Sequence, residues 1–232
     1  MHQPHVTCSL ADILLCSFKN LNTLMSDVEQ YQPKVLLTFL EPAISGISVA
    51  DAVSAWKKYI IPIREKFPKM KVGSPSVMYV LTLFFPFLDH SLTLFSFSSN
   101  GPDSLPWIKE FIKTCPECKF DFLDVHYYWT YEEFQGEIEM WHSQFPKRNI
   151  WVTDIGFQSY SPAPPECQKG DTKCVSMIKK MITWMDKTRY IKRYTFRGEF
   201  RTDQGQAHQP LWSFINDNGD YTPLGKWYLG IS

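Results

Sequence analysis

The chain has 232 residues, which is enough for one large α/β domain or at most two small ones. Hydrophobic residues make up 44% and charged residues 21%, a balance that excludes a disordered chain. The 24 lysines and arginines equal the 24 aspartates and glutamates in number. We therefore expect neither nucleic acid nor an anionic membrane surface as a partner.

Short apolar runs alternate with amphipathic segments along most of the chain. The run 35–39 predicts a buried strand that delivers Glu41 just beyond its end. Ser48 and Asp51 form a capping box at the start of a helix that continues to about residue 67, with a kink at Pro62. The same reasoning predicts strands at 70–73, 120–126, 149–154 and 190–196, helices at 105–114, 131–142 and 172–187, and a turn at 217–219.

Strands that alternate with helices predict a parallel sheet, either doubly wound or closed into a barrel. Glu41, the stretch from His126 to Tyr128, and Asp154 all stand at the carboxyl ends of predicted strands, where barrel enzymes build their sites. A doubly wound fold would favour a glycine-rich first turn, which the sequence lacks. We therefore predict an α/β protein with a single (β/α)8 TIM-barrel domain over residues 1–232.

The predicted barrel is short at its beginning. Only residues 1–34 precede the strand before Glu41, whereas a complete barrel takes about 250 residues in all. We expect the barrel to be incomplete at the N-terminus, either truncated or open.

The tract 78–99 interrupts the alternation of strands and helices. It is apolar, contains no lysine or arginine, and has a length that suits a membrane-spanning helix. However, Pro86, Asp89 and His90 stand at its centre, and no basic residues flank it closely. We predict an insertion into the domain, with a translated intron as one origin, rather than a membrane span.

Six cysteines include two that are close in sequence at 115 and 118, and two more at 167 and 174. Local disulfides in a secreted protein are the favoured interpretation, followed by reduced thiols and then by a zinc site. The first residues lack the basic start and continuous apolar stretch of a signal peptide, so they are either no signal or not the true beginning. We expect no cofactor and no metal.

Five motifs carry a resemblance to a known family. FLEPA, GSPSV, DFLDVHYY, NIWVTDIGF and YTPLGKWY occur in an order that resembles glycoside hydrolase family 128, whose members include the alkali-sensitive-linkage-protein-like glycosyl hydrolases of fungal cell walls. The resemblance covers residues 35–228 apart from the 78–99 tract. It implies a barrel that cleaves β-1,3-glucan with retention of configuration, with β-glucan as the partner and a location outside the cell or in the cell wall. We also expect a monomer.

The resemblance also assigns roles to individual residues. Glu41 matches the acid/base of the family's Asn-Glu-Pro, and Asp154 falls where the family places its nucleophile. His126 and Tyr128 match a His-Trp-Tyr strand end that lines the sugar site, with Tyr127 in place of the tryptophan. Two aromatic residues that follow strand ends, Trp129 and Phe157, are the candidates for stacking on sugar rings.

Two departures from the family's pattern leave the activity open. Leu40 replaces the asparagine, which removes a hydrogen bond to a sugar hydroxyl, and the family's glutamate nucleophile is one methylene shorter here as Asp154. Glu199, just past the last predicted strand, is a further candidate for the second carboxylate, although nothing in the sequence positions it. Three interpretations remain: a β-1,3-glucanase that is impaired, a degenerate member that binds β-glucan without cleaving it, and a defective gene product that does not fold stably.

Overall fold

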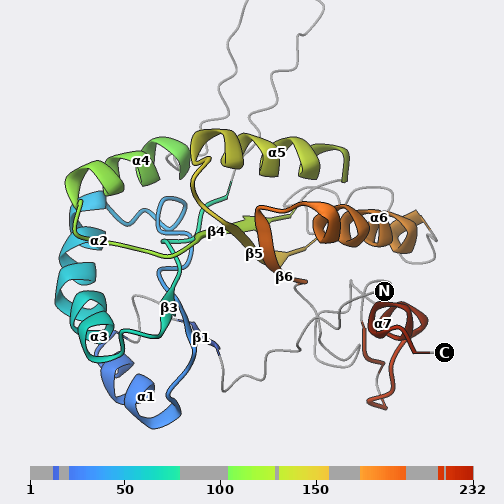
Figure 1. Cartoon of the computed structure of the whole chain (residues 1–232), viewed down its shortest axis with the longest axis horizontal. Helices are drawn as coiled ribbons and strands as arrows, with labels where there is room; N and C mark the ends of the chain where they lie inside the picture. Colours follow the sequence, from blue (N-terminus) through green and yellow to red (C-terminus); the bar gives the residue numbers. More distant parts are fainter. Residues whose placement is uncertain are drawn as a thin grey trace, which may run out of the picture. The chain divides into compact units, whose positions relative to one another are not determined.

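The computed structural model describes residues 13–15, 21–78, 104–128, 131–156, 173–196, 214–216 and 218–231. The chain divides into two compact units, which we call the N-terminal unit (Leu10–Asp121) and the C-terminal unit (from Phe122 onwards). Each unit contains a sheet of three parallel strands with helices between them (Figure 1). The prediction of an α/β protein with parallel strands is confirmed. The described residues form two separate three-stranded sheets and show no closed barrel.

The N-terminal unit has the strand order β1-β2-β3, with all neighbours parallel. Its elements are β1 (Ile13–Leu15), α1 (Leu24–Tyr31), β2 (Val35–Leu37), α2 (Val49–Ala55), η1 (Trp56–Ile60), α3 (Ile61–Lys66), β3 (Lys71–Val72) and α4 (Ser104–Thr114). Among the described residues, one βα unit, β1 with α1, precedes β2.

The predicted long helix is continuous but changes its geometry before Pro62. Ser48 caps it as expected, because its hydroxyl accepts a 3.1 Å hydrogen bond from the Asp51 amide. The middle segment, η1, is a π-helix in which the Ile61 amide donates to the Trp56 carbonyl, five residues back. A proline in a regular helix would clash with the carbonyl four residues earlier, so a widened turn just before Pro62 relieves that clash without breaking the helix. Figure 1 shows α2, η1 and α3 as one helical rod.

An aromatic cluster forms the core of the N-terminal unit. The Trp56 ring is fully buried, and it meets Phe39 and Phe111 edge-on at centroid distances of 5.8 and 5.4 Å. Trp107 stacks on Phe111 at 5.6 Å. The tryptophans of these helices therefore serve the core between sheet and helices, as their apolar spacing predicts.

The C-terminal unit has the strand order β4-β5-β6, again with all neighbours parallel. Its elements are β4 (Leu123–Tyr127), α5 (Tyr131–Gln144), β5 (Ile150–Ile155), α6 (Lys173–Lys187), β6 (Ile191–Phe196) and α7 (Pro223–Leu229). Helices α5 and α6 contact each other, and α6 also contacts β6. The sequence had not predicted β1, α1 or α7.

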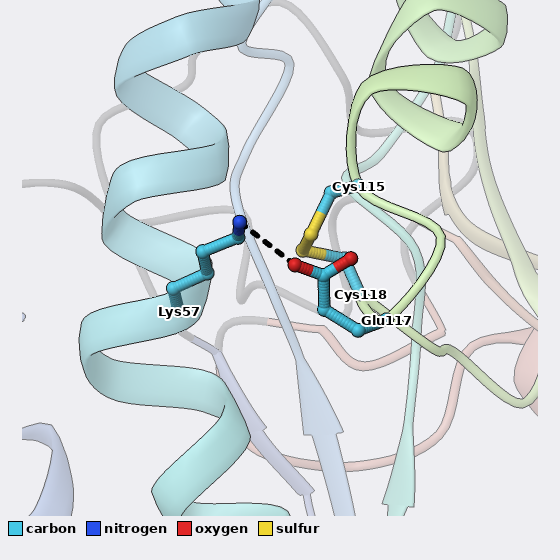
Figure 2. The surroundings of a disulfide bond; sticks show 4 residues. All are labelled: Lys57, Cys115, Glu117 and Cys118. Atoms are coloured by element: carbon cyan, nitrogen blue, oxygen red, sulfur yellow. Dashed lines mark ion pairs between the residues drawn. A yellow bond between two sulfur atoms is a disulfide. The ribbon is translucent and has the colours of Figure 1, made fainter.

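A local disulfide joins Cys115 to Cys118 at the end of α4, with their Cα atoms 5.2 Å apart, and this confirms one predicted pair. Figure 2 shows Lys57 of η1 reaching Glu117, which lies between the two cysteines, and the ion pair measures 2.7 Å. Lys57 holds the pKa of the Glu117 carboxyl below its usual value. Cys174 is also disulfide-bonded, and its predicted partner Cys167 lies outside the described residues.

The apolar tract lies almost entirely outside the described residues, which resume at Ser104. Met78, the first residue of the tract, contacts the residue at which the described chain resumes, because its amide donates a 3.3 Å hydrogen bond to the Ser104 hydroxyl. Both residues are buried. The described residues before and after the gap at 79–103 are therefore neighbours, and the insertion itself stays a prediction. In the part of the chain that the structure describes, no helix is long and apolar enough to cross a membrane.

Candidate active site

Glu41 lies four residues beyond the last residue of β2, in a strained backbone conformation. Its φ is +41°, and Glu41 is one of two non-glycine residues with positive φ among those described. The left-handed region costs an ordinary residue about 1–2 kcal/mol. Such outliers persist where the surrounding structure holds them, and they cluster at functional sites.

The conformation at Glu41 is held by two hydrogen bonds to its backbone atoms. The Glu41 amide donates to the Ser76 hydroxyl at 2.7 Å, and the Glu41 carbonyl accepts from the Ser45 amide at 2.9 Å. The Glu41 side chain is half-buried, whereas the neighbouring Leu40 exposes 42% of its surface. An apolar side chain thus stands exposed beside the candidate acid/base.

Residues 73–76 extend the pairing between β2 and β3 out to this point. The Gly73 amide donates to the Leu36 carbonyl at 2.9 Å, and the Thr38 hydroxyl donates to the Gly73 carbonyl at 3.1 Å. Next along the chain, the Ser76 amide donates to the Phe39 carbonyl at 2.9 Å. The motif GSPSV, which sequence comparison singled out without a role, therefore supports the segment that carries Glu41.

The second candidate carboxylate is part of a hydrogen-bonded cluster in the C-terminal unit. The Tyr128 hydroxyl donates to Asp154 at 2.6 Å, a distance typical of a strong bond to a carboxylate. Nδ1 of His126 lies 3.5 Å from the same hydroxyl. His126 and Tyr128 are almost fully buried, and Asp154 is half-buried. The structure thus brings together three residues that the sequence placed at the ends of two strands.

A β-bulge turns Asp154 toward this cluster. Val125 pairs with Val152, but the next residue of β4, His126, pairs with Asp154, so Thr153 is an extra residue in β5. Because side chains alternate between the two faces of a strand, an unbulged strand would place Asp154 on the face opposite Thr153. The extra residue lets both face the side that His126 occupies. Bulges near active sites commonly re-aim a side chain in this way.

The bulge is tied to a buried carboxylate that the sequence had not suggested. The Thr153 hydroxyl hydrogen-bonds to Asp124, which lies two residues before His126 on β4 and is 1% exposed. A buried carboxylate requires hydrogen-bond partners to offset its desolvation. Asp124 in the motif DFLDVHYY was the only available signal, since an acidic residue inside an apolar strand is uncommon.

Tyr127, predicted as a sugar-binding residue, lies in a different environment from His126 and Tyr128. It is fully buried, and its ring packs edge-on against Phe134 of α5 at 4.9 Å. Alternation along β4 places it on the face opposite His126 and Tyr128. The two stacking candidates, Trp129 and Phe157, lie outside the described residues. Within the described parts of the chain, no group of three or more histidine, cysteine or acidic side chains is arranged to hold a metal ion.

The two candidate carboxylates both follow parallel strands of an α/β fold. The chain belongs to the glycosyl hydrolase catalytic core family, whose model matches residues 16–228.

Among curated proteins, the chain is similar to alkali-sensitive linkage protein 1 of Schizosaccharomyces pombe, with 29% identity over 201 residues. This match covers 84% of the chain and 32% of that protein, so the chain spans about a third of its relative's length.

Two solved structures of glycoside hydrolase family 128 share the fold. One is an endo-β-1,3-glucanase from Lentinula edodes, with a TM-score of 0.68 and 20% identity, covering 93% of this chain and 79% of that one. The other is an oligosaccharide-binding protein from Cryptococcus neoformans, with a TM-score of 0.65 and 18% identity, covering 94% of this chain and 78% of that one. The predicted resemblance to family 128 is confirmed.

Proposed function

We propose that the chain is a glycoside hydrolase that cleaves β-1,3-glucan with retention of configuration, using Glu41 as acid/base and Asp154 as nucleophile. The observation that carries this proposal is the hydrogen bond from Tyr128 to Asp154, on a strand whose bulge re-aims that carboxylate. The strained, hydrogen-bonded backbone of Glu41 supports the second role. The Lentinula edodes structure, described as an endo-β-1,3-glucanase, supports the choice of substrate.

The proposed reaction has two steps. Asp154 attacks the anomeric carbon of the glucan while Glu41 gives its proton to the departing glycosidic oxygen, so the bond to that oxygen breaks as the bond to the aspartyl oxygen forms. Glu41 then takes a proton from water, and the water oxygen displaces Asp154 from the same carbon. Retention requires carboxyl groups about 5–5.5 Å apart. The shorter aspartate side chain is expected to slow the attack, since misplacement by about 1 Å can cost 10²-fold in rate.

A second candidate function is binding of β-glucan without cleavage. Leu40 favours it, because an exposed leucine beside Glu41 offers no hydrogen bond to a sugar hydroxyl in the transition state. The Cryptococcus neoformans structure, described as an oligosaccharide-binding protein, provides a precedent for such a role on this fold.

We also propose that both units belong to one barrel-type domain, monomeric and located outside the cell or in the cell wall. The family and the curated relative, an alkali-sensitive linkage protein, support this location. The Cys115–Cys118 disulfide supports it as well, because disulfides persist in oxidising compartments.

Hydrolysis and binding of laminarin, a soluble β-1,3-glucan, distinguish the two functions. We would measure both for the natural chain, for Glu41→Gln, and for the double change Leu40→Asn with Asp154→Glu. A glucanase loses its hydrolysis with Glu41→Gln and gains rate with the double change, whereas a binding protein holds laminarin in all three forms without releasing reducing sugar. Hydrolysis that survives Glu41→Gln would refute the site assignment. Absence of binding and hydrolysis in every form would refute both functions.

A further inference from the structure

We infer that Ser76 is a positioning residue for the acid/base Glu41, acting through the backbone rather than by touching substrate. This inference rests on the proposed function, in which Glu41 must present its proton to one glycosidic oxygen. Neither the sequence motif GSPSV nor the family resemblance assigned Ser76 a role.

The Ser76 side chain joins the two residues that flank Leu40. Its hydroxyl accepts the 2.7 Å hydrogen bond from the Glu41 amide and donates a 3.3 Å hydrogen bond to the Phe39 carbonyl. The Ser76 amide donates to that same carbonyl at 2.9 Å. One serine therefore fixes the chain before and after Leu40.

Burial makes this contact difficult to replace. Ser76 is 3% exposed, so a water molecule has little access to the Glu41 amide from that side. Ser76→Ala therefore removes the side-chain hydrogen bond to the Glu41 amide. The Ser45 bond to the Glu41 carbonyl would remain, because it is made by backbone atoms alone.

The consequence for chemistry follows from the left-handed backbone at Glu41. A φ of +41° sets the direction of the Cα–Cβ bond, and this direction sets where the carboxyl group points. If the amide is released, the residue is free to return to an ordinary backbone region, and the carboxyl group then moves. A displacement of about 1 Å at a reacting group can cost roughly 10²-fold in rate.

The chain contains a matched control two residues away. Ser74 is also a fully buried serine of the same segment, and its hydroxyl donates to the neighbouring Pro75 carbonyl at 2.8 Å. Both serine-to-alanine changes remove one buried hydroxyl, but only Ser76→Ala removes the contact with Glu41. Differences between the two variants therefore report on Glu41 and not on general stability.

The test compares two substrates that differ in their need for an acid. A β-1,3-linked glucose oligosaccharide has a sugar as its leaving group, and the departing oxygen needs a proton from the acid. A dinitrophenyl β-glucoside releases dinitrophenolate, a stable anion that needs little protonation. We expect Ser76→Ala to lower kcat/KM for the oligosaccharide by roughly 10²-fold. The kcat/KM for the dinitrophenyl glucoside is expected to change by less than about threefold. Ser74→Ala is expected to change kcat/KM by the same factor for both substrates. Equal losses on both substrates with Ser76→Ala would overturn the inference.

A second measurement does not depend on turnover. Hydrogen exchange of the Glu41 amide, followed by NMR, is expected to accelerate by at least roughly tenfold in Ser76→Ala, while the Ser45 amide keeps its protection. If the natural chain cleaves neither substrate, the proposed catalytic function fails, and exchange alone decides whether Ser76 holds Glu41. An unchanged exchange rate at Glu41 would overturn the inference in either case.

Discussion

The Tyr128 hydroxyl lies 2.6 Å from a carboxylate oxygen of Asp154 and links the ends of two neighbouring parallel strands. Tyr128 follows β4, and Asp154 is the next-to-last residue of β5. Tyr128 is 4% exposed and Asp154 is half-buried, so the donor side of the bond is shielded from water. A carboxylate held in this way keeps one orientation, as a nucleophile must.

Tyr128→Phe tests that bond directly. The change keeps the buried ring and removes the donor, so we expect kcat/KM on laminarin to fall by about 10- to 100-fold, the range for a hydrogen bond to a charged group. Tyr127→Phe is the control, because Tyr127 faces Phe134 on the other side of β4 and should leave turnover unchanged. Equal rates for Tyr128→Phe and the natural chain would show that the bond does not serve catalysis.

Thr153→Val tests the anchor of the bulge. Valine has the shape of threonine but cannot donate to the buried Asp124, and a lost hydrogen bond to a charged group costs about 1.5–3 kcal/mol. We expect the free energy of unfolding in urea to fall by that amount, with the rate on laminarin falling as well. Thr153→Ser keeps the hydroxyl and should recover most of both. If valine and serine behave alike, the bond to Asp124 does not stabilise the bulge.

Gly225→Ala tests a close approach in the motif YTPLGKWY. A Cβ at Gly225 would lie 2.2 Å from the Phe214 carbonyl oxygen, a backbone atom that cannot move aside easily. We expect a loss of about 2 kcal/mol or more in the free energy of unfolding. Gly136→Ala is the control, because that site in α5 has open space, and alanine there should stabilise the helix by about 0.5–1 kcal/mol. Similar results for the two variants would contradict the packing at Gly225.

Tyr194 should make the protein lose stability in alkali. Burial, followed by the hydrogen bond to Asp186, raises its pKa above the ordinary 10.0. The unfolded chain therefore ionises this tyrosine first as the pH rises past about 10, and the folded state becomes relatively less stable. We expect urea unfolding between pH 8 and 11 to show a steeper loss for the natural chain than for Tyr194→Phe. Parallel pH profiles would refute the assignment.

Deletion of residues 79–99 tests whether the apolar tract is an insertion. The hydrogen bond between Met78 and Ser104 shows that the described ends already meet, and residues 100–103 would remain as the connection. We expect the shortened chain to unfold cooperatively, with a free energy within about 1 kcal/mol of the natural chain. A deletion that also removes Met78 should be less stable, because it loses a buried side chain. Failure of the first deletion to fold would show that the tract belongs to the domain.

Periodic and capping patterns predicted most helices and strands of both units, with small errors at their ends; β1, α1 and α7 were not predicted. The helix signal from Ser48 onwards and the strand signals that lead to Glu41 and Asp154 are local, because they depend on burial of one face and on bonds between residues close in sequence. The elements β1 and α7 were missed because they are short, and their stability comes from neighbours distant in the chain.

The sequence by itself identified the candidate residues, since a carboxylate after an apolar strand is visible in a linear pattern. Only the tertiary structure decided how each carboxylate is held. Ser76 and Glu41 are 35 positions apart, and Asp124 and Thr153 are 29 apart. Such hydrogen bonds depend on strand register, and the bulge at Thr153 shifts that register by one residue. A single extra residue reverses the face of a side chain, and no local pattern records it.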